Sequence, residues 1–335
     1  MSFEWADWRQ RLELLCDRIR AAALTPPAQS DDGSSQRGRA ERPLSVGAGD
    51  VSYALDEKSE RVLDEWLLEI GSAHALSVLS EDRGWRHAGP GHPTDFDHGG
   101  PRIAFDPVDG TRNLMADLRS AWTVVSCAGP GDSQPRMSEV ELGIVSEIPT
   151  RAADRFRRLS ANKKGPCRIE TRLLESGRLL AQGTLEATRD DRPDHGYFPF
   201  FRYLPDQRAD IARVEAAFFE QLAAHEGADL RSCYDDQYIS SAGQLVLLSL
   251  GTYRMICDLR ALAGPPGNRK VTSKPYDLAG AVLCARAAGC VVTEPDGAEL
   301  EFPIDCETPV GFVGWTNAET AARLSPHLRT ALAVR

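Results

Sequence analysis

The sequence predicts a mixed α and β protein built as two halves, and three observations lead to this fold class. Residues 121–128 and 140–145 have the β-branched and aromatic content typical of strands, and further short strands are predicted through Leu185. An amphipathic helix pattern precedes them, and from Ala242 onward helices and strands alternate. The predicted division is an N-terminal α+β half over residues 1–185, an aromatic-rich connection over 186–205 and a C-terminal α/β half over 206–335.

The composition is that of a globular protein with an acidic surface. The chain has 335 residues, of which 42% are hydrophobic and 26% are charged, so collagen, coiled coil and general disorder are excluded. The 49 Asp and Glu against 39 Lys and Arg give a formal net charge of −10. Such a balance argues against electrostatic binding of nucleic acid or of a membrane surface. An anionic substrate would need a local reversal of this charge.

The cysteines and the N-terminus predict a soluble cytoplasmic protein. The eight cysteines form no CxxC motif, and a chain of this length needs no disulfide framework, so reduced thiols are expected. The first twenty residues are charged throughout and have no apolar core, which is unlike a signal peptide. No run approaches 18 uninterrupted apolar residues, so no membrane span is predicted.

Periodicity and turn residues predict the elements of the N-terminal half. Trp5, Trp8 and Leu12 begin a helical pattern, and Asp56 is placed as the possible N-cap of a second helix. In chain order we expect a helix through residue 19, a mobile loop over 24–49, a helix over 56–70, a strand over 75–79, an exposed connection over 87–100 and a strand over 102–105.

The C-terminal half begins with an irregular stretch over 190–210, centred on the aromatic run at 197–203. This run is expected to be a local hydrophobic cluster, with a dimer contact or a lid as alternatives. Beyond it we expect helices over 210–225, 242–250 and 275–288 and from residue 318, with Gly289 closing the third of these, and strands over 253–257, 290–293 and 310–315.

The residues DPVDGT, 106–111, carry the strongest chemical signal. They follow a buried strand and precede a helix, so Asp106 and Asp109 lie beside unpaired backbone N–H groups. Carboxylates hold hard cations and the N–H groups hold a phosphate, while Gly110 lets the backbone approach an oxyanion closely. The alternative, an ordinary Asp-Gly turn with a helix cap, applies to most such dipeptides but does not explain the longer string.

This string resembles the metal-binding motif of the inositol monophosphatase family, within the superfamily that includes fructose-1,6-bisphosphatases and phosphoadenosine-phosphate phosphatases. Three further segments resemble that family in the expected order, so the likeness covers most of the chain from Val51 to Trp315. They are LSED at 79–82, similar to the family's GEE segment; Asp56 with its helix, similar to a TxxD helix; and residues 273–297, similar to the WDxAAG region.

The resemblance implies the layered αβαβα fold and hydrolysis of a phosphate monoester with two or three Mg²⁺ ions. The ion ligands that it implies are Glu81, Asp106, the Val108 carbonyl, Asp109 and Asp277. It further implies that Glu81 and Thr111 orient the attacking water, that Asp56 fixes the Thr111 hydroxyl, and that the N–H groups of Gly110 and Thr111 bind phosphate. Divalent cations would neutralise the carboxylates and lower the pKa of a bound water.

The substrate contacts depart from the family pattern. The resemblance implies contacts from Asp109, Ala242 and Asp258, the last as acceptor for a substrate hydroxyl. Tyr276, Cys290 and Leu114 replace residues that are usual in the family, and the sequence diverges from residue 244 onward. Three cations follow in this region: Arg260, Arg269 and Lys270. Either they bind a second phosphate or a polar leaving group of the substrate, or they are solvated charges without a ligand.

The expected function is Mg²⁺-dependent, lithium-sensitive hydrolysis of inositol monophosphate or a related small polyol phosphate. Fructose 1,6-bisphosphate and 3′-phosphoadenosine 5′-phosphate are alternative substrates for the same chemistry. An alternative of another class is a catalytically weak protein that binds phosphorylated ligands or acts as a scaffold. The family suggests a possible homodimer. A second group, His87, His92, Asp95, Asp97 and His98, has no ligand spacing typical of a metal site.

Overall fold

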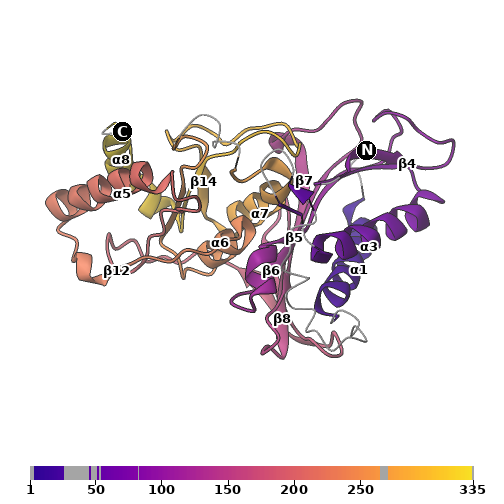
Figure 1. Cartoon of the computed structure of the whole chain (residues 1–335), viewed down its shortest axis with the longest axis horizontal. Coiled ribbons are helices and arrows are strands. Elements are labelled where there is room, and N and C mark those ends of the chain that lie inside the picture. The colour runs from indigo at the N-terminus through magenta and orange to yellow at the C-terminus, as the bar shows by residue number, and fades with distance from the viewer. Residues whose placement is uncertain are drawn as a thin grey trace.

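The computed structural model arranges the chain as five alternating layers of helices and sheets. It describes residues 4–25, 45–46, 51–52, 54–81, 83–264 and 271–333. Figure 1 shows helices packed on one face of a large sheet and further helices on its other face, followed by a small sheet and a last layer of helices. The predicted αβαβα order of layers is confirmed. No helix in the described segments is long and apolar enough to cross a membrane.

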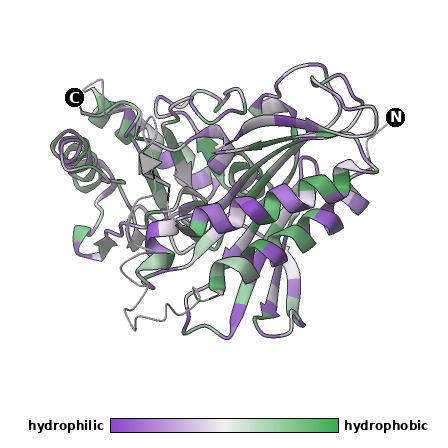
Figure 2. Ribbon diagram, turned by 45° about the vertical axis from the view of Figure 1, so that its right-hand side comes forward, coloured by the Kyte–Doolittle hydropathy of each residue, from purple (hydrophilic) through white to green (hydrophobic). Residues whose placement is uncertain are grey.

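The first layer consists of α1 (Trp5–Leu24) and α3 (Ala54–Gly71). Figure 2 shows hydrophilic and hydrophobic residues alternating along these two outer helices. The apolar stripe of α1, with Leu12 and Leu15, shares one core cluster with α3 and with the near face of the large sheet. The N-cap prediction for Asp56 is wrong, because α3 begins at Ala54 and Asp56 lies inside its first turn. The predicted loop over 24–49 lies mostly outside the described residues.

The large sheet has eight strands in the order β10-β9-β8-β7-β6-β5-β3-β4. All neighbours are antiparallel except β3 and β5, which run parallel. The central strands are buried on both faces because helices cover both sides of the sheet. The strands are β3 (Leu76–Ser80), β4 (Gly84–Ala88), β5 (Arg102–Asp109), β6 (Ala121–Ala128), β7 (Val140–Ile148), β8 (Arg155–Asn162), β9 (Cys167–Leu173) and β10 (Leu179–Leu185).

The edge strand β4 corrects the predicted exposed connection over 87–100. His87 belongs to β4 and pairs with Ser77 of β3. Sequence reasoning missed this strand because every residue of β4 is half-buried and the glycine-rich loop that follows dominates the local composition. The connection therefore begins after Ala88.

The third layer consists of α6 (Ser241–Ser249) and α7 (Pro275–Ala288), which lie between the two sheets. Both ends of α7 match the prediction, since Pro275 occupies its first turn and Gly289 closes it with φ 101°. The helix approaches the sheet very closely: a Cβ added to Gly280 would lie 2.2 Å from the Val125 carbonyl oxygen, and one added to Gly143 would lie 2.4 Å from the Gly280 carbonyl oxygen. Glycine on both sides sets the separation of α7 from the sheet.

The last two layers are a small sheet and a pair of helices. Strands β13 (Met255–Asp258), β15 (Phe312–Trp315) and β14 (Val291–Thr293) form the sheet in that order, covered by α5 (Arg208–Gln221) and α8 (Ala318–Leu332). The predicted alternation of helices and strands is confirmed. However, the strands pair antiparallel, whereas such alternation is typical of parallel sheets. The boundary between the halves stays a prediction, because α7 packs directly on the first sheet.

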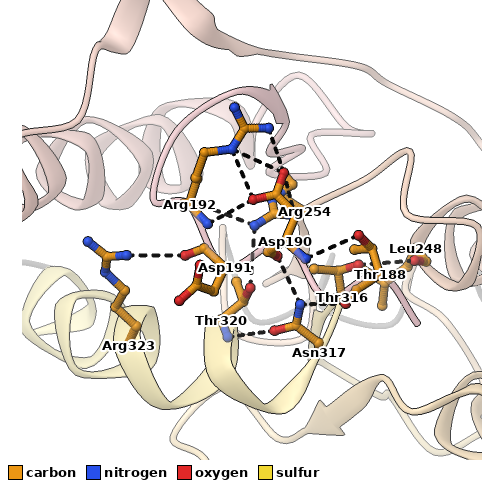
Figure 3. A network of polar contacts seen from close by, with 10 residues as sticks. All are labelled: Thr188, Asp190, Asp191, Arg192, Leu248, Arg254, Thr316, Asn317, Thr320 and Arg323. Atoms are coloured by element: carbon orange, nitrogen blue, oxygen red, sulfur yellow. Dashed lines mark hydrogen bonds and ion pairs between the residues drawn. The ribbon is translucent and has the colours of Figure 1, made fainter. Parts of the chain in front are cut away.

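The connecting segment is held by an aromatic cluster and a polar network. Phe198 and Phe200 are fully buried against α5, which confirms that the aromatic run is a local hydrophobic cluster. Figure 3 shows the polar network at the start of α8. There Asn317 caps the helix by accepting from the Thr320 N–H at 2.7 Å and donates to the carbonyl groups of Thr188 and Asp190.

Candidate active site

The candidate site begins where β5 ends. The pairing of β5 with β6 shifts register between Asp106 and Asp109, and the helix α4 (Thr111–Met115) starts two residues later. Gly110 joins them with φ 97°, in the left-handed region. A Cβ on Gly110 would also lie 3.1 Å from the Ser240 side chain, so both conformation and space favour glycine. The predicted change from strand to helix at the motif is thus confirmed.

Four carboxylates gather at this end of the sheet. Asp106 and Asp109 come from β5, Asp277 from the first turn of α7, and Glu81 from the turn after β3. Burial raises the pKa of Asp106 well above its usual range, and the charges of Asp109, Glu81 and Asp277 raise it further. The pKa of Asp277 is raised for the same two reasons. Segments nearly 200 residues apart therefore form one acidic site.

Hydrogen bonds hold the three buried carboxylates in fixed directions. The Val108 N–H donates to Asp106 Oδ1 at 2.8 Å, and the Lys274 N–H donates to Asp277 at 3.0 Å. Asp109 Oδ2 accepts from the Ser240 hydroxyl and from the Ala242 N–H, both at 2.7 Å. Burial nevertheless raises the pKa of Asp109 to about 6, although these bonds lower it.

The oxygen atoms at this site are ligands of the type that a hard divalent cation prefers. The oxygen ligands available are carboxylates and the Val108 carbonyl, the type that Mg²⁺ prefers. Burial is the main cause of the raised pKa values of Asp106 and Asp277, and the charges of the neighbouring carboxylates raise them further, which a bound cation would offset. In the described part of the chain no three His, Cys, Asp or Glu side chains are close enough together to hold a metal ion as they stand. A bound ion would therefore require these carboxylate side chains to move toward one another.

The Thr111 hydroxyl lies between two acceptors. Its Oγ1 is 2.8 Å from Asp56 Oδ1 and 2.9 Å from the Val108 carbonyl oxygen. The expected contact between Asp56 and Thr111 is therefore present, although the two residues are 55 positions apart. Asp56 is suited to it because the first turn of α3 points at the start of α4. The catalytic roles of the pair stay predictions.

Sequence reasoning missed Glu60, which supports the site from the same helix. Glu60 lies one turn beyond Asp56 on α3 and is buried. Its Oε2 accepts from the Ser80 hydroxyl at 2.9 Å, and Arg86 Nη2 lies 3.9 Å away. Because Ser80 immediately precedes Glu81, this contact fixes the end of β3 that carries Glu81. No local signal singled out Glu60, because α3 carries acidic residues at 56, 57, 60, 64, 65 and 69.

A second set of contacts missed by sequence reasoning fixes the position of α4. The Asn113 side chain donates to the Ile239 carbonyl at 2.7 Å. On the other side of the same loop, Tyr238 accepts from Trp122 Nε1 and donates to the Ser120 carbonyl, at 2.7 and 2.6 Å. The loop before α6 is thereby tied to β6 and to α4. This tie keeps Ser240 next to Asp109.

Asp258 has a different environment from the one expected. It is buried, and the Arg260 guanidinium donates to both of its oxygens, from Nε at 2.9 Å and from Nη2 at 2.7 Å. The Ser273 hydroxyl also donates to it at 3.0 Å. Acceptance of a substrate hydroxyl by Asp258 and contact of substrate with Ala242 stay predictions. Arg269 and Lys270 lie outside the described residues.

The histidine-rich segment does not form a metal site within the described chain. Instead, the buried Ser77 hydroxyl lies 2.8 Å from His87 Nδ1 and 2.6 Å from His98 Nε2. Burial lowers the pKa of both histidines, which favours neutral rings. The cluster therefore anchors the loop after β4 to the sheet.

Comparison with known proteins gives structural neighbours only. No protein-family model matches the sequence, and no curated protein matches it. Among solved structures, the fructose-1,6-bisphosphatase of Leishmania major is similar with a TM-score of 0.68 and 13% identity, covering 98% of this chain and 93% of that chain. This chain has the inositol monophosphatase and fructose-1,6-bisphosphatase fold.

Two more neighbours agree with this fold. The inositol monophosphatase of Thermotoga maritima has a TM-score of 0.61 at 14% identity, over 98% of this chain and 99% of that one. The extragenic suppressor protein SuhB of Bartonella henselae has a TM-score of 0.62 at 13% identity, over 97% and 99%. The inositol monophosphatase fold therefore extends over nearly the whole chain. At these identities the likeness establishes the fold alone.

Proposed function

We propose that this chain hydrolyses a small phosphate monoester with Mg²⁺, and that inositol monophosphate or a related polyol phosphate is its substrate. One observation carries the proposal: the Thr111 hydroxyl, held at 2.8 Å by Asp56, lies at the start of α4 beside a cluster of buried carboxylates. A purely structural turn would not gather like charges in a buried place, because their repulsion opposes folding.

Each residue of the site has a distinct task in this reaction. Glu81, Asp106, Asp109, Asp277 and the Val108 carbonyl hold the ions. When bound, Mg²⁺ lowers the pKa of a water and neutralises charge on the phosphate oxygens. The N–H groups of Gly110 and Thr111 bind the phosphate at the start of α4.

Water activation rests on the Asp56 and Thr111 pair together with Glu81. The Asp56 carboxylate accepts a hydrogen bond from the Thr111 hydroxyl, so the Thr111 oxygen is left to accept a hydrogen bond from a water. Glu81 accepts a proton from the same water and orients it in line with the leaving oxygen. Glu60 and Ser80 position Glu81 for this task.

The structural neighbours support phosphate-ester chemistry but differ among themselves in substrate. One neighbour is named a fructose-1,6-bisphosphatase and another an inositol monophosphatase. A third neighbour, also named an inositol monophosphatase, has 2′-AMP bound. Fructose 1,6-bisphosphate and 3′-phosphoadenosine 5′-phosphate therefore remain alternative substrates. A phosphate-ligand-binding or scaffold protein of weak activity is the alternative of another class.

Phosphate release from inositol 1-phosphate, fructose 1,6-bisphosphate and 3′-phosphoadenosine 5′-phosphate tests the proposal, with and without Mg²⁺. We expect Mg²⁺-dependent release in the wild type and loss of at least about 10²-fold in Asp106→Asn. The control is Asp154→Asn, which alters an exposed aspartate far along the chain. Tight binding of these esters without release in saturating Mg²⁺ would contradict the proposal and favour the binding protein.

Two further properties belong to the same proposal. Inhibition by Li⁺ is measured by adding lithium chloride to the release assay, with sodium chloride at equal ionic strength as control. A homodimer is measured by light scattering at several protein concentrations. Neither result alters the assignment of the carboxylates.

A further inference from the structure

The Arg260 guanidinium places a positive charge where the resemblance implies only an acidic group for the substrate. Arg260 is 7% exposed and its ion-pair partner Asp258 is 1% exposed. Besides the two bonds to Asp258, Nη2 donates to the Ser273 hydroxyl at 3.0 Å. Both Asp258 oxygens already accept from Arg260, so the carboxylate serves first to hold this cation.

Some N–H donors of the Arg260 guanidinium have no acceptor among the described residues. Of its five N–H groups, the one on Nε and the two on Nη2 have acceptors. The two N–H groups on Nη1 have no acceptor among the described residues. Nη1 is also not among the described side-chain atoms that are fully buried without a hydrogen-bond partner. Nη1 therefore reaches accessible space and can donate two hydrogen bonds to a ligand.

A chain of hydrogen bonds through Ser273 and the start of α6 connects Arg260 to the acidic site. The Ser273 hydroxyl that accepts from Arg260 lies 2.5 Å from the Ser241 hydroxyl, at the start of α6. The next residue, Ala242, donates its N–H to Asp109. The charges of Asp277 and Asp109 also act on the guanidinium and raise its pKa, although burial lowers it. The cation therefore lies beside the carboxylates.

An aromatic stack fixes the guanidinium from its other side. The Arg260 Cζ lies 4.5 Å from the centre of the Phe201 ring, and Phe201 stacks on Tyr203 at 6.3 Å with 9° between the planes. The opposite end of this stack meets Arg112, which follows Thr111 in the sequence. Because Phe201 is only 3% exposed, it offers no open face for a nucleobase.

We propose that Arg260 selects phosphate monoesters whose alcohol portion carries a second anionic group, a phosphate or a carboxylate. A carboxylate can only accept hydrogen bonds, whereas a guanidinium can only donate them, so exchanging one for the other changes the preferred substrate group from a hydroxyl to an anion. The inference rests on the proposed phosphatase activity and, within it, favours esters such as fructose 1,6-bisphosphate over inositol monophosphate, which has no second anionic group.

Two matched pairs of esters test this selection: fructose 1,6-bisphosphate against fructose 1-phosphate, and 2-phosphoglycerate against glycerol 2-phosphate. The first pair differs by a phosphate and the second by a carboxylate, so the pairs distinguish the two anions. We expect the wild type to favour the member that carries the second anionic group, in at least one pair, by about tenfold or more in kcat/KM. We expect Arg260→Met, which retains packing on Phe201, to reduce that preference to less than about threefold.

The controls separate selection from folding. Because Arg260→Met leaves Asp258 buried without its partner, the double variant Asp258→Asn, Arg260→Met is measured beside it. Arg158→Met is the matched control: Arg158 is also buried, pairs with Asp17 and lies 5.8 Å from the Phe156 ring, on the α1 side of the large sheet. It should keep the wild-type preference.

Binding of the same four esters by calorimetry, with Ca²⁺ in place of Mg²⁺, gives an independent readout. If no ester releases phosphate, the proposed function fails, and the binding preference still tests Arg260. A preference for the members without a second anionic group, or a preference for the members with it that both variants retain, would overturn the inference. Loss of the preference in both variants, with Arg158→Met unchanged, would support it.

Discussion

Replacement of Gly280 by alanine should separate α7 from the large sheet and thereby disturb the site. The added Cβ would lie 2.2 Å from the Val125 carbonyl oxygen, whereas ordinary contacts begin near 3.4 Å. The two nearest atoms belong to the Val125 backbone, which cannot rotate away, so α7 must move by about 1 Å. Overpacking of this kind costs about 3 kcal/mol, against about 1 kcal/mol gained from alanine in a helix. We expect a net loss of about 2 kcal/mol in the free energy of unfolding.

The same shift should lower activity, because Asp277 lies three residues before Gly280 on α7. A displacement of about 1 Å at a metal-binding carboxylate typically costs about 10²-fold in rate. Urea unfolding measures the stability and phosphate release measures the rate. Gly183→Ala is the control, because a Cβ there meets nothing within 4 Å. A Gly280→Ala protein with wild-type stability and rate would refute the reasoning.

Three further predictions follow from the contacts described. Thr111→Val, which removes the hydroxyl held by Asp56, should lower kcat about 10²-fold with little change in stability, and Thr111→Ser should retain most activity in the release assay. Asp109 has its pKa raised to about 6 from 3.8, so in EDTA the folded state retains a proton that the unfolded chain loses. The free energy of unfolding should therefore fall as pH rises from about 4 to 6, and it should fall less in Asp109→Asn; urea titrations at several pH values check this. Mg²⁺ binding should weaken below about pH 6, which calorimetry at several pH values checks. Asn317→Ala should cost about 1–3 kcal/mol in urea unfolding and leave kcat unchanged, and a change in kcat alone would contradict this.

Local patterns in the sequence were sufficient to predict most elements. The strand over 121–128 and the helix over 275–288 match the structure at both ends, because alternation, proline and glycine act within a few residues. The prediction failed at the N-cap at Asp56 and at the missed strand β4. For Asp56, α3 begins two residues earlier, at Ala54, and the side chain instead contacts Thr111, 55 positions away. For β4, the pairing with β3 is close in the sequence, but half-buried residues and the glycine-rich loop after it hide the strand pattern.

The residues of the candidate site likewise differ in whether the sequence could predict them. The DPVDGT motif identified Asp106, Asp109 and Thr111 because carboxylates, glycine and a hydroxyl at fixed spacing are recognisable in one short string. Glu60 and the tie from Asn113 to Ile239 could not be found, since their partners are at least 20 positions away. Asp258 stays a predicted substrate contact, and its two hydrogen bonds from Arg260 depend on how the chain turns after β13.

The sequence by itself determined the succession of helices and strands and the chemical type of the DPVDGT turn, because both follow from interactions between residues close along the chain. Only the tertiary structure decided which carboxylates meet, how closely α7 approaches the sheet, and that Asp258 faces a cation. These outcomes depend on side chains from separate layers packed in one place, and no local pattern encodes the distance between layers.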